Sequence, residues 1–524
     1  MSKRFTVTGI CIPHKNYMVD IGDRLETILT DYIDKGKYFT INRARQYGKT
    51  TTLYLLEQYI KNRGLVIRIS LEAADEMFAS LYAMAAGFIR KTGRVLRQQS
   101  VSRTILENWN RPLSEQFPFD DLSERITELC RNAGQNVILM IDEVDKSSDN
   151  QIFLSFLGLL RTKYLGQLEG RDITFQSVIL AGVYDIKNLK LKIHPQAESK
   201  YNSPWNIAAD FMVSMSFSAE DIALMLAEYE QDHETGMDTE QIGAMIYMYT
   251  SGYPYLVSRI CQLIDERLPG TADFPVGTDA WTPAGVRAAE LLLRRESNTL
   301  LEDMVKQLDE YPRLRRILQN ILFCGARYPF EKDNFLINLG LTLGFLKEKE
   351  GSVQIANRIF ETKLYDLFLS EEAMEQTAEP ISQNQFVKDG RLQMNLVMEK
   401  FYEYFTEIYS DREEAFLETQ GRKIFLIFLK PIINGTGNYY IEAETRDRKR
   451  TDIIVDYRGE QFIIELKIWH GNEYNQRGEE QLFEYLQFYR ANRGYLLSFC
   501  FSKKKKAGIR EISGNGKKIM EVVV

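Results

Sequence analysis

The sequence predicts an α/β chain, with a parallel sheet covered by helices in its first part and a smaller α/β unit near its C-terminus. In residues 1–215, short apolar runs alternate with amphipathic helical stretches, as buried parallel strands and their covering helices do. A Gly-Lys-Thr sequence at residues 48–50 stands where the first apolar run passes into a helix. Close to the C-terminus, two apolar strands flank Arg458-Gly459 and carry charged residues at one end.

Length and composition set the class of protein. A chain of 524 residues exceeds one ordinary core, so roughly two to four domains are expected. The sequence lacks an apolar run of about 18 residues and the apolar core of a signal peptide, so we expect no membrane association. The 5 cysteines are scattered without a CxxC pair. This usage favours a reducing, cytoplasmic location and excludes a disulfide framework.

The first chemical motif lies between residues 37 and 60. Residues 37–42 are predicted to form a strand and residues 53–60 a helix. A phosphate at the start of this helix meets backbone N–H groups and the positive end of the helix dipole. Lys49 is therefore expected to reach the β- and γ-phosphates of a nucleotide, and Thr50 to hold Mg²⁺. The expected nucleotide contacts of the loop are Arg45, Gly48, Lys49, Thr50 and Thr51.

A second apolar strand supports a nucleotide site. Residues 135–141 run into Asp142-Glu143, the pattern of a Walker B strand in a central parallel sheet. Asp142 is expected to bind Mg²⁺ through water, and Glu143 to orient or deprotonate the attacking water. Both motifs in this order predict ATP binding. Asp185, after a further strand at residues 177–182, is either a sensor of the γ-phosphate or a helix N-cap.

Several stretches of this half resemble the AAA-ATPase-like domain of bacterial proteins. They are Tyr17-Met-Val-Asp20, the loop 43–50 and Ser203-Pro-Trp-Asn-Ile. The usual P-loop has a glycine where this chain has Arg43, but the family commonly has Arg-Pro-Arg-Arg-Phe-Gly-Lys-Ser/Thr. The resemblance implies a P-loop NTPase core over residues 1–215, a helical lid over residues 216–295 and a possible homo-oligomer through the ATPase domain.

Within the expected lid, Gly252-Tyr-Pro254 resembles the GYP/GHP stretch of related ATPases. The resemblance makes Arg259 the candidate to face the phosphates. The alternative is a Gly-Tyr-Pro turn that only starts a helix.

The middle of the chain offers two interpretations. Residues 300–369 contain helices, a charged glycine turn and a short strand, which indicates a winged-helix-like module. Such a module binds DNA through a helix in the major groove. The corresponding helix is apolar here, which favours a packing role instead. Residues 370–386 are acidic, contain Pro and lack apolar periodicity, so a linker is expected.

The C-terminal hairpin carries the second chemical motif. With Arg458-Gly459 as a two-residue turn, Asp452 falls opposite Glu465, and strand period places Lys467 on the face of Glu465. Two carboxylates this close repel, and a divalent cation such as Mg²⁺ or Mn²⁺ would relieve the repulsion and polarise a phosphoryl oxygen. The alternative is a polar cluster on a solvated face.

Together with Gln481 and Tyr485, spaced i, i+4 on a helix, these residues resemble the PD-(D/E)xK nuclease superfamily. The resemblance implies a restriction-endonuclease-like α/β domain over residues 387–524. Asp452 and Glu465 would hold the metal, Lys467 would position water, and Gln481 and Tyr485 would orient substrate or catalytic groups. The family often adds a glutamate from a preceding helix. Here the best match is Glu418, with Glu413 and Glu414 as rivals.

The charge pattern is compatible with a nucleic-acid partner. The net charge of −7 does not favour one, but residues 446–450 and 503–506 form basic groups beside the expected site. Solvated loops are the alternative. The hypothesis is an ATPase coupled to a metal-dependent nuclease, with DNA preferred on resemblance. Its rivals are a regulatory NTPase whose nuclease-like domain only binds nucleic acid or a protein, and a nuclease with an inert nucleotide-binding scaffold.

Overall fold

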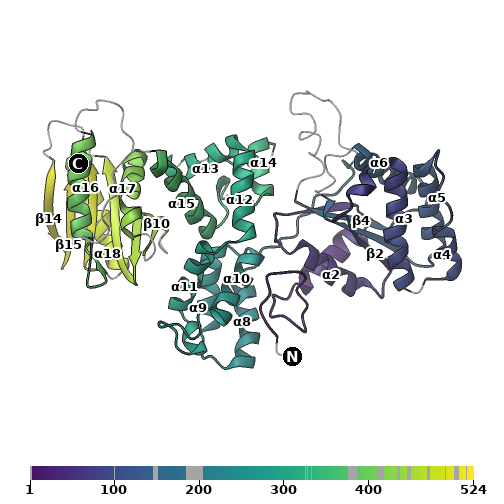
Figure 1. Cartoon of the computed structure of the whole chain (residues 1–524), viewed down its shortest axis with the longest axis horizontal. Coiled ribbons are helices and arrows are strands. Elements are labelled where there is room, and N and C mark those ends of the chain that lie inside the picture. Colours follow the sequence, from purple (N-terminus) through teal and green to yellow (C-terminus); the bar gives the residue numbers. More distant parts are fainter. Residues whose placement is uncertain are drawn as a thin grey trace. The chain divides into compact units, whose positions relative to one another are not determined.

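The computed structural model describes residues 3–99, 101–144, 151–183, 205–324, 326, 328–331, 333–375, 386–409, 418–433, 437–444, 450–468, 472–489, 491–500, 507–514 and 516–524 (Figure 1). The chain forms two compact units. The first comprises Met1–Leu314 and Pro329–Phe360, and the second Arg315–Tyr328 and Glu361–Val524. Residues 300–369, expected as one module, are divided between them.

A four-stranded parallel sheet forms the centre of the first unit. Its strands are β1 (Phe39–Asn42), β2 (Leu65–Ser70), β3 (Val137–Asp142) and β4 (Ser177–Gly182), in the spatial order β1-β4-β3-β2. Ala209 adds a single parallel bridge to Phe39, on the other side of β1 from β4.

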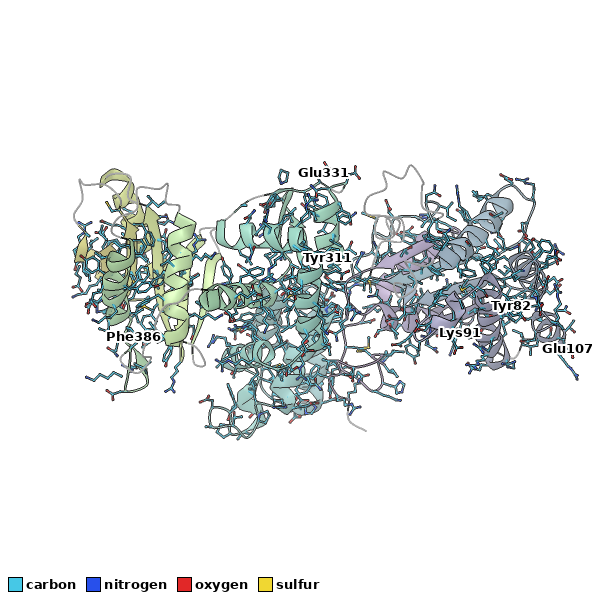
Figure 2. The ribbon with its side chains drawn as sticks, turned by 45° about the horizontal axis from the view of Figure 1, so that its top comes forward. Tyr82, Lys91, Glu107, Tyr311, Glu331 and Phe386 are labelled. Carbon is cyan, nitrogen blue, oxygen red and sulfur yellow. The ribbon has the colours of Figure 1, made fainter. Side chains whose placement is uncertain are left out.

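Helices cover both faces of this sheet. They are α1 (Gly22–Ile28), which continues as a π-helical turn (Leu29–Ile33), α2 (Lys49–Ile60), α3 (Leu81–Gln98), α4 (Arg103–Trp109), α5 (Pro118–Asn132) and α6 (Gln151–Leu168). A short 3-10 helix, Asp75–Phe78, precedes α3. The outer surfaces of α3 and α4 carry Tyr82 and Glu107, which are labelled in Figure 2.

The side chains of β3 contribute to the two hydrophobic cores, one on each face of the sheet. Leu139 and Ile141 belong to the core shared with α3, α5 and α6, whereas Ile138 and Met140 belong to the core shared with α1 and α2. All six residues of β3 are buried. A strand that is buried on both faces has a continuous apolar sequence, and this is the pattern by which the sequence predicted it.

The rest of the first unit is mainly helical. It contains α8 (Ala219–His233), α9 (Thr239–Thr250), α10 (Pro254–Glu266), α11 (Pro283–Arg295), α12 (Thr299–Glu310) and α14 (Phe335–Thr342), with a 3-10 turn at Gly277–Ala280. Ser218 and Asp221 form a capping box at the start of α8. Strands β6 (Leu346–Lys349) and β7 (Ser352–Ile355) form an antiparallel hairpin. Three elements reach the boundaries between units: α13 (Pro312–Cys324), β5 (Tyr328–Pro329) and α15 (Arg358–Glu375).

The second unit is built on a six-stranded mixed sheet in the order β10-β11-β12-β13-β15-β14. The strands are β10 (Gly437–Glu444), β11 (Arg450–Tyr457), β12 (Glu460–Ile468), β13 (Arg493–Phe499), β14 (Gly508–Gly514) and β15 (Lys517–Val523). A two-stranded ribbon, β8 (Val387–Lys388) with β9 (Arg391–Leu392), precedes α16 (Met394–Tyr409). Next to this ribbon, Phe386, labelled in Figure 2, is fully buried and packs against Phe428.

Helix α18 (Asn472–Phe488) connects the parallel strands β12 and β13 and packs on the sheet through Leu482, Tyr485 and Leu486. Helix α17 (Glu418–Ile433) packs against β12 and α16. At Gly421 an added Cβ would lie 2.3 Å from the ring of Phe499, on β13. The backbone of α17 therefore lies directly against a sheet side chain at this glycine.

Candidate functional site

The loop between β1 and α2 has the backbone of a phosphate-binding loop. Gln46 (φ 54°) and Gly48 (φ 81°) are both left-handed, and successive residues of alternating handedness turn their N–H groups towards one concave side. The Lys49 ammonium donates to the carbonyl oxygens of Arg43 and Ala44, each at 2.9 Å. Helix α2 begins at Lys49, so its first N–H groups face the same concavity.

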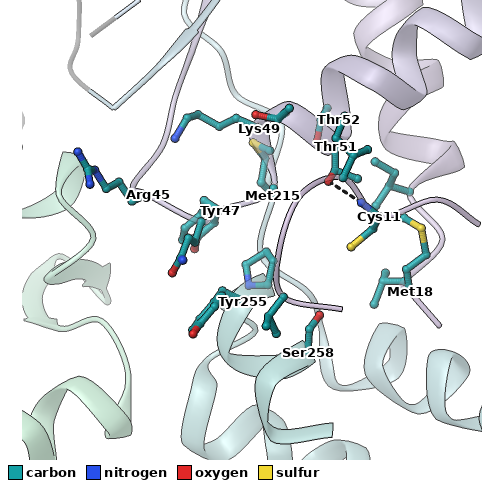
Figure 3. A pocket seen from close by; sticks show the side chains of 18 of the residues that line it. Cys11, Met18, Arg45, Tyr47, Lys49, Thr51, Thr52, Met215, Tyr255 and Ser258 are labelled. Carbon is teal, nitrogen blue, oxygen red and sulfur yellow. Dashed lines mark hydrogen bonds between the residues drawn. The ribbon is translucent and has the colours of Figure 1, made fainter. Parts of the chain in front are cut away.

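A cavity of about 660 Å³ opens at this loop, within the range of small-molecule sites. Its lining includes Arg45 and the stretch 46–52, the N-terminal segment 6–11, Glu143, Met215, Phe217 and, from α10, Pro254, Tyr255 and Ser258. Figure 3 shows Lys49, Thr51 and Thr52 on one side of this cavity and Tyr255 and Ser258 on another. The Cys11 N–H donates to Oγ1 of Thr51 at 3.3 Å, which ties the N-terminal segment to α2.

The two acids come from the end of β3. Asp142 is buried, and its Oδ1 accepts the N–H of Glu143 at 2.9 Å. Glu143 has a left-handed backbone (φ 59°) and lines the cavity. Strand β4 lies between β1 and β3, so the loop and the acids meet at the carboxyl edge of one parallel sheet. This strand order, the loop and α2 give the first unit the fold of a P-loop NTPase. Asp185 lies outside the described residues.

Arg259 occupies a different position from the expected one. Its Nε donates to Glu296 at 2.7 Å, its Nη2 forms a second bond to the same carboxylate, and its Nη1 donates to Gln262. A bidentate carboxylate pair holds a guanidinium firmly. The contribution of α10 to the cavity comes instead from Pro254, Tyr255 and Ser258.

Arg45 lies at the cavity but also reaches α12. Its Nη1 is 3.1 Å from Oδ1 of Asp303, and the neighbouring Gln46 donates to Thr299 at 3.2 Å. The Tyr253 hydroxyl donates to the Arg45 carbonyl. Sequence reasoning missed these contacts and the N-terminal lining, because they join segments that are distant in the sequence and no residue spacing predicts such contacts.

The C-terminal hairpin has the expected register. Arg458 (φ 52°) and Gly459 (φ 84°) form a left-handed two-residue turn, and the pairs run from Tyr457 with Glu460 to Ile453 with Ile464. One step further, the Asp452 carboxylate accepts the N–H of Leu466 at 2.7 Å through Oδ2. Asp452 therefore lies beside the strand segment that carries Glu465.

Glu465 is fully buried next to a cation. Burial, followed by the charge of Asp452, raises the pKa of Glu465 to about 8, and Lys467 opposes this shift. The Lys467 ammonium lies 2.9 Å from Oε1 of Glu465 and stabilises its ionised form. Among the described residues, no donor reaches either Glu465 oxygen with good hydrogen-bond geometry. In its ionised form, such a carboxylate is a suitable ligand for a hard divalent cation.

Sequence reasoning did not identify Arg422, which also belongs to this site. Its Nη2 donates to Oδ1 of Asp452 at 3.1 Å, and both residues are buried. The expectation of two carboxylates in conflict did not assign them these cationic partners: Arg422 pairs with Asp452 and Lys467 with Glu465, while the charge of Asp452 still raises the pKa of Glu465. The arginine lies on α17 without a recognisable spacing to the hairpin.

The other expected residues are placed as follows. Gln481 Nε2 donates to the Tyr485 hydroxyl at 2.7 Å on α18. Burial raises the pKa of Tyr485, and the charges of Glu465 and Asp452 add to this effect. Glu418 begins α17, but its side chain is outside the described set, as are residues 413, 414, 446–449 and 503–506. Within the described ranges, no group of three or more His, Cys, Asp or Glu residues could hold a metal ion.

The chain has limited similarity to known proteins, and no family model matches it. The "Uncharacterized WD repeat-containing protein slr0143" of Synechocystis sp. (strain ATCC 27184 / PCC 6803 / Kazusa) is 23% identical over 349 residues. These cover 64% of this chain and 28% of that protein, so the chain spans less than a third of the relative's length.

Solved structures resemble the N-terminal two thirds. The Walker-type ATPase PABY2304 of Pyrococcus abyssi has a TM-score of 0.46 at 14% identity, covering 69% of this chain and 99% of its own. The Aeropyrum pernix ORC2 protein in ADPNP–ADP complexes has 0.35 at 13%, covering 68% and 97%. The Aeropyrum pernix ORC1 protein in complex with DNA has 0.33 at 13%, covering 68% and 94%. Among the helices that the structure describes, none is long and apolar enough to cross a membrane.

Proposed function

We propose that the chain binds and hydrolyses ATP in its first unit and couples this to metal-dependent cleavage of phosphodiester bonds, with DNA as the preferred polymer, in its second. The observation that carries the first part is the convergence of Lys49, Thr50 and Glu143 on one nucleotide-sized cavity. A homo-oligomer through the ATPase domain belongs to the same proposal.

The cavity suits the parts of ATP. The phosphates would lie in the loop 45–51, at the start of α2, where N–H groups and the Lys49 ammonium donate to them. The apolar side chains Met215, Phe217 and Pro254 line the same cavity and suit a purine ring. Thr50 and the buried Asp142 would hold Mg²⁺, which neutralises phosphate charge when bound. Glu143 orients the attacking water and accepts its proton.

Two substitutions test the ATPase in the full chain. Lys49→Ala should abolish ATP binding, measured by calorimetry. Glu143→Gln should keep binding but lower phosphate release by about 10²-fold or more, because a general base contributes that much. Lys61→Ala, at the other end of α2, is the matched control and should behave as wild type. ATP binding that survives Lys49→Ala would refute the assignment.

The second part of the proposal is supported by the approach of Asp452, Glu465 and Lys467. Among the described residues, the Glu465 oxygens have no donor with good hydrogen-bond geometry, whereas Asp452 already accepts two donors. Glu465 and Asp452 would hold Mg²⁺ or Mn²⁺, which polarises a phosphoryl oxygen when bound. Lys467 would position the attacking water, and Gln481 and Tyr485 would orient the substrate. Glu418 stays a candidate from the resemblance.

Plasmid cleavage with Mg²⁺ or Mn²⁺, with and without ATP, tests this part. Asp452→Ala should abolish cleavage, and Lys49→Ala should remove its dependence on ATP. Cleavage that is unchanged by ATP and by Lys49→Ala would support the rival in which the first unit is an inert nucleotide-binding scaffold. ATP turnover without cleavage under any metal would support the rival function, a regulatory NTPase whose second unit only binds nucleic acid or a protein.

A further inference from the structure

Arg422 is held at the carboxylate site by the packing of its helix. On one side of it in the sequence, Gly421 lies against the Phe499 ring, where even a Cβ would not fit. On the other side, Phe425 and Leu426 of α17 are fully buried. The backbone of α17 is thus fixed against the sheet around Arg422, so the approach of its guanidinium to Asp452 does not depend on a mobile surface side chain.

Both oxygens of Asp452 are engaged. Oδ2 accepts the N–H of Leu466 at 2.7 Å, and Oδ1 accepts Nη2 of Arg422 at 3.1 Å. The bond from Arg422 comes from a side chain, so another ligand of Oδ1 can replace it. A divalent cation that coordinates Oδ1 would have to replace this guanidinium, because two cations on one carboxylate oxygen in a buried site repel strongly.

The charges of the site favour the same conclusion. Arg422 and Lys467 provide two positive charges beside the two carboxyl groups of Asp452 and Glu465. The site therefore has no net negative charge without a metal ion. A divalent cation added to a compensated cluster gains less Coulomb energy than one added to two carboxylates alone.

We propose that Arg422 is a positioning residue that competes with the divalent cation for Asp452, so that the carboxylate site takes up metal only as the guanidinium moves off Oδ1. This inference rests on the proposed metal site of the second unit. Arg422 acts through Asp452 and weakens metal binding, which a purely structural ion pair would not do.

Mn²⁺ binding by the full chain without nucleotide tests the competition. Free Mn²⁺ is followed by electron paramagnetic resonance, and Asp452→Asn serves as the blank for binding elsewhere. Arg422→Gln removes the competing charge and should bind Mn²⁺ at least about tenfold more tightly than wild type, equivalent to about 1.4 kcal/mol. Arg422→Lys keeps the charge and should stay near wild type. Arg458→Gln, exposed at the hairpin turn, is the matched control.

The outcomes separate this inference from the proposed function. If wild type binds Mn²⁺, Asp452→Asn does not, and Arg422→Gln binds no more tightly, the competition is refuted while the metal site stands. If no protein binds above the blank, both are refuted. Should Arg422→Gln be unstable, thermal unfolding replaces the titration. Mn²⁺ should then raise its melting temperature more than that of wild type, and an equal rise would refute the competition.

Discussion

The contact between Gly421 and Phe499 allows a stability effect to be worked out in advance. In Gly421→Ala the new Cβ would lie 2.3, 2.4 and 2.7 Å from three atoms of one ring. Phe499 is fully buried and packs against Phe405 at a centroid distance of 5.3 Å. Either the buried ring or α17 must therefore shift, and overpacking of this kind costs about 1–3 kcal/mol.

The same substitution gains helix propensity. Alanine is about 1 kcal/mol better than glycine in a helix interior, so the expected net loss for Gly421→Ala is up to about 2 kcal/mol. Gly158, inside α6, is the matched control because no atom lies within 4 Å of its added Cβ. Gly158→Ala should therefore stabilise the protein by up to about 1 kcal/mol.

Differential scanning calorimetry reads the two units separately. The transition that ATP raises is assigned to the first unit, because a ligand stabilises the state it binds. Gly421→Ala should lower the melting temperature of the other transition, whereas Gly158→Ala should raise that of the ATP-sensitive one. A Gly421→Ala protein whose second transition melts above the wild-type temperature, as expected for a glycine without close neighbours, would refute the packing argument.

Three further predictions concern the first unit. Arg125 donates to Asp121 and lowers the pKa of that carboxyl to about 2. The pair therefore stabilises the fold above about pH 4, and this stabilisation is lost as the pH falls towards 2. Between pH 5 and 2.5, the melting temperature of Asp121→Asn should fall less steeply than that of wild type. Arg259→Ala should lower the stability of the first unit by about 1 kcal/mol through loss of the Glu296 pair. Its ATP affinity, measured by calorimetry, should equal that of wild type, and a weakened affinity would support the expected role of Arg259 at the phosphates. Gly252 has a left-handed backbone, and in Gly252→Ala the new Cβ would lie 1.8 Å from the Phe217 carbonyl oxygen. The substitution should lower the free energy of unfolding by about 3 kcal/mol or more and weaken ATP binding. A wild-type melting temperature would contradict this expectation.

The sequence predicted those features that depend on local rules. The hairpin register followed from strand periodicity and from a turn pair suited to left-handed backbone, which the Tyr457–Glu460 pairing confirms. The start of α2 followed from Gly48-Lys49 after an apolar strand. The acids at the end of β3 followed from a run that is apolar on both faces.

The features that were missed depend on packing between distant segments. Arg422 reaches Asp452 because Gly421 lets α17 approach the sheet, which no spacing in the sequence reveals. Arg45 finds Asp303 more than two hundred residues away. Arg259 follows the expected Gly-Tyr-Pro turn, but the position of Glu296 on the neighbouring segment decides where its guanidinium points.

The place of β1 in the sheet has a consequence for synthesis of the protein. Phe39 pairs with Ile179, 140 positions later (179 − 39), so the partner strand leaves the ribosome roughly 7–28 s after β1 at about 5–20 residues per second. Phe39 and Ile41 are fully buried in the finished sheet. During that interval they cannot pair with β4, because it has not yet been synthesised. The loop that follows β1 therefore obtains its neighbouring strand late in translation, and until then the apolar side chains of β1 are exposed to aggregation.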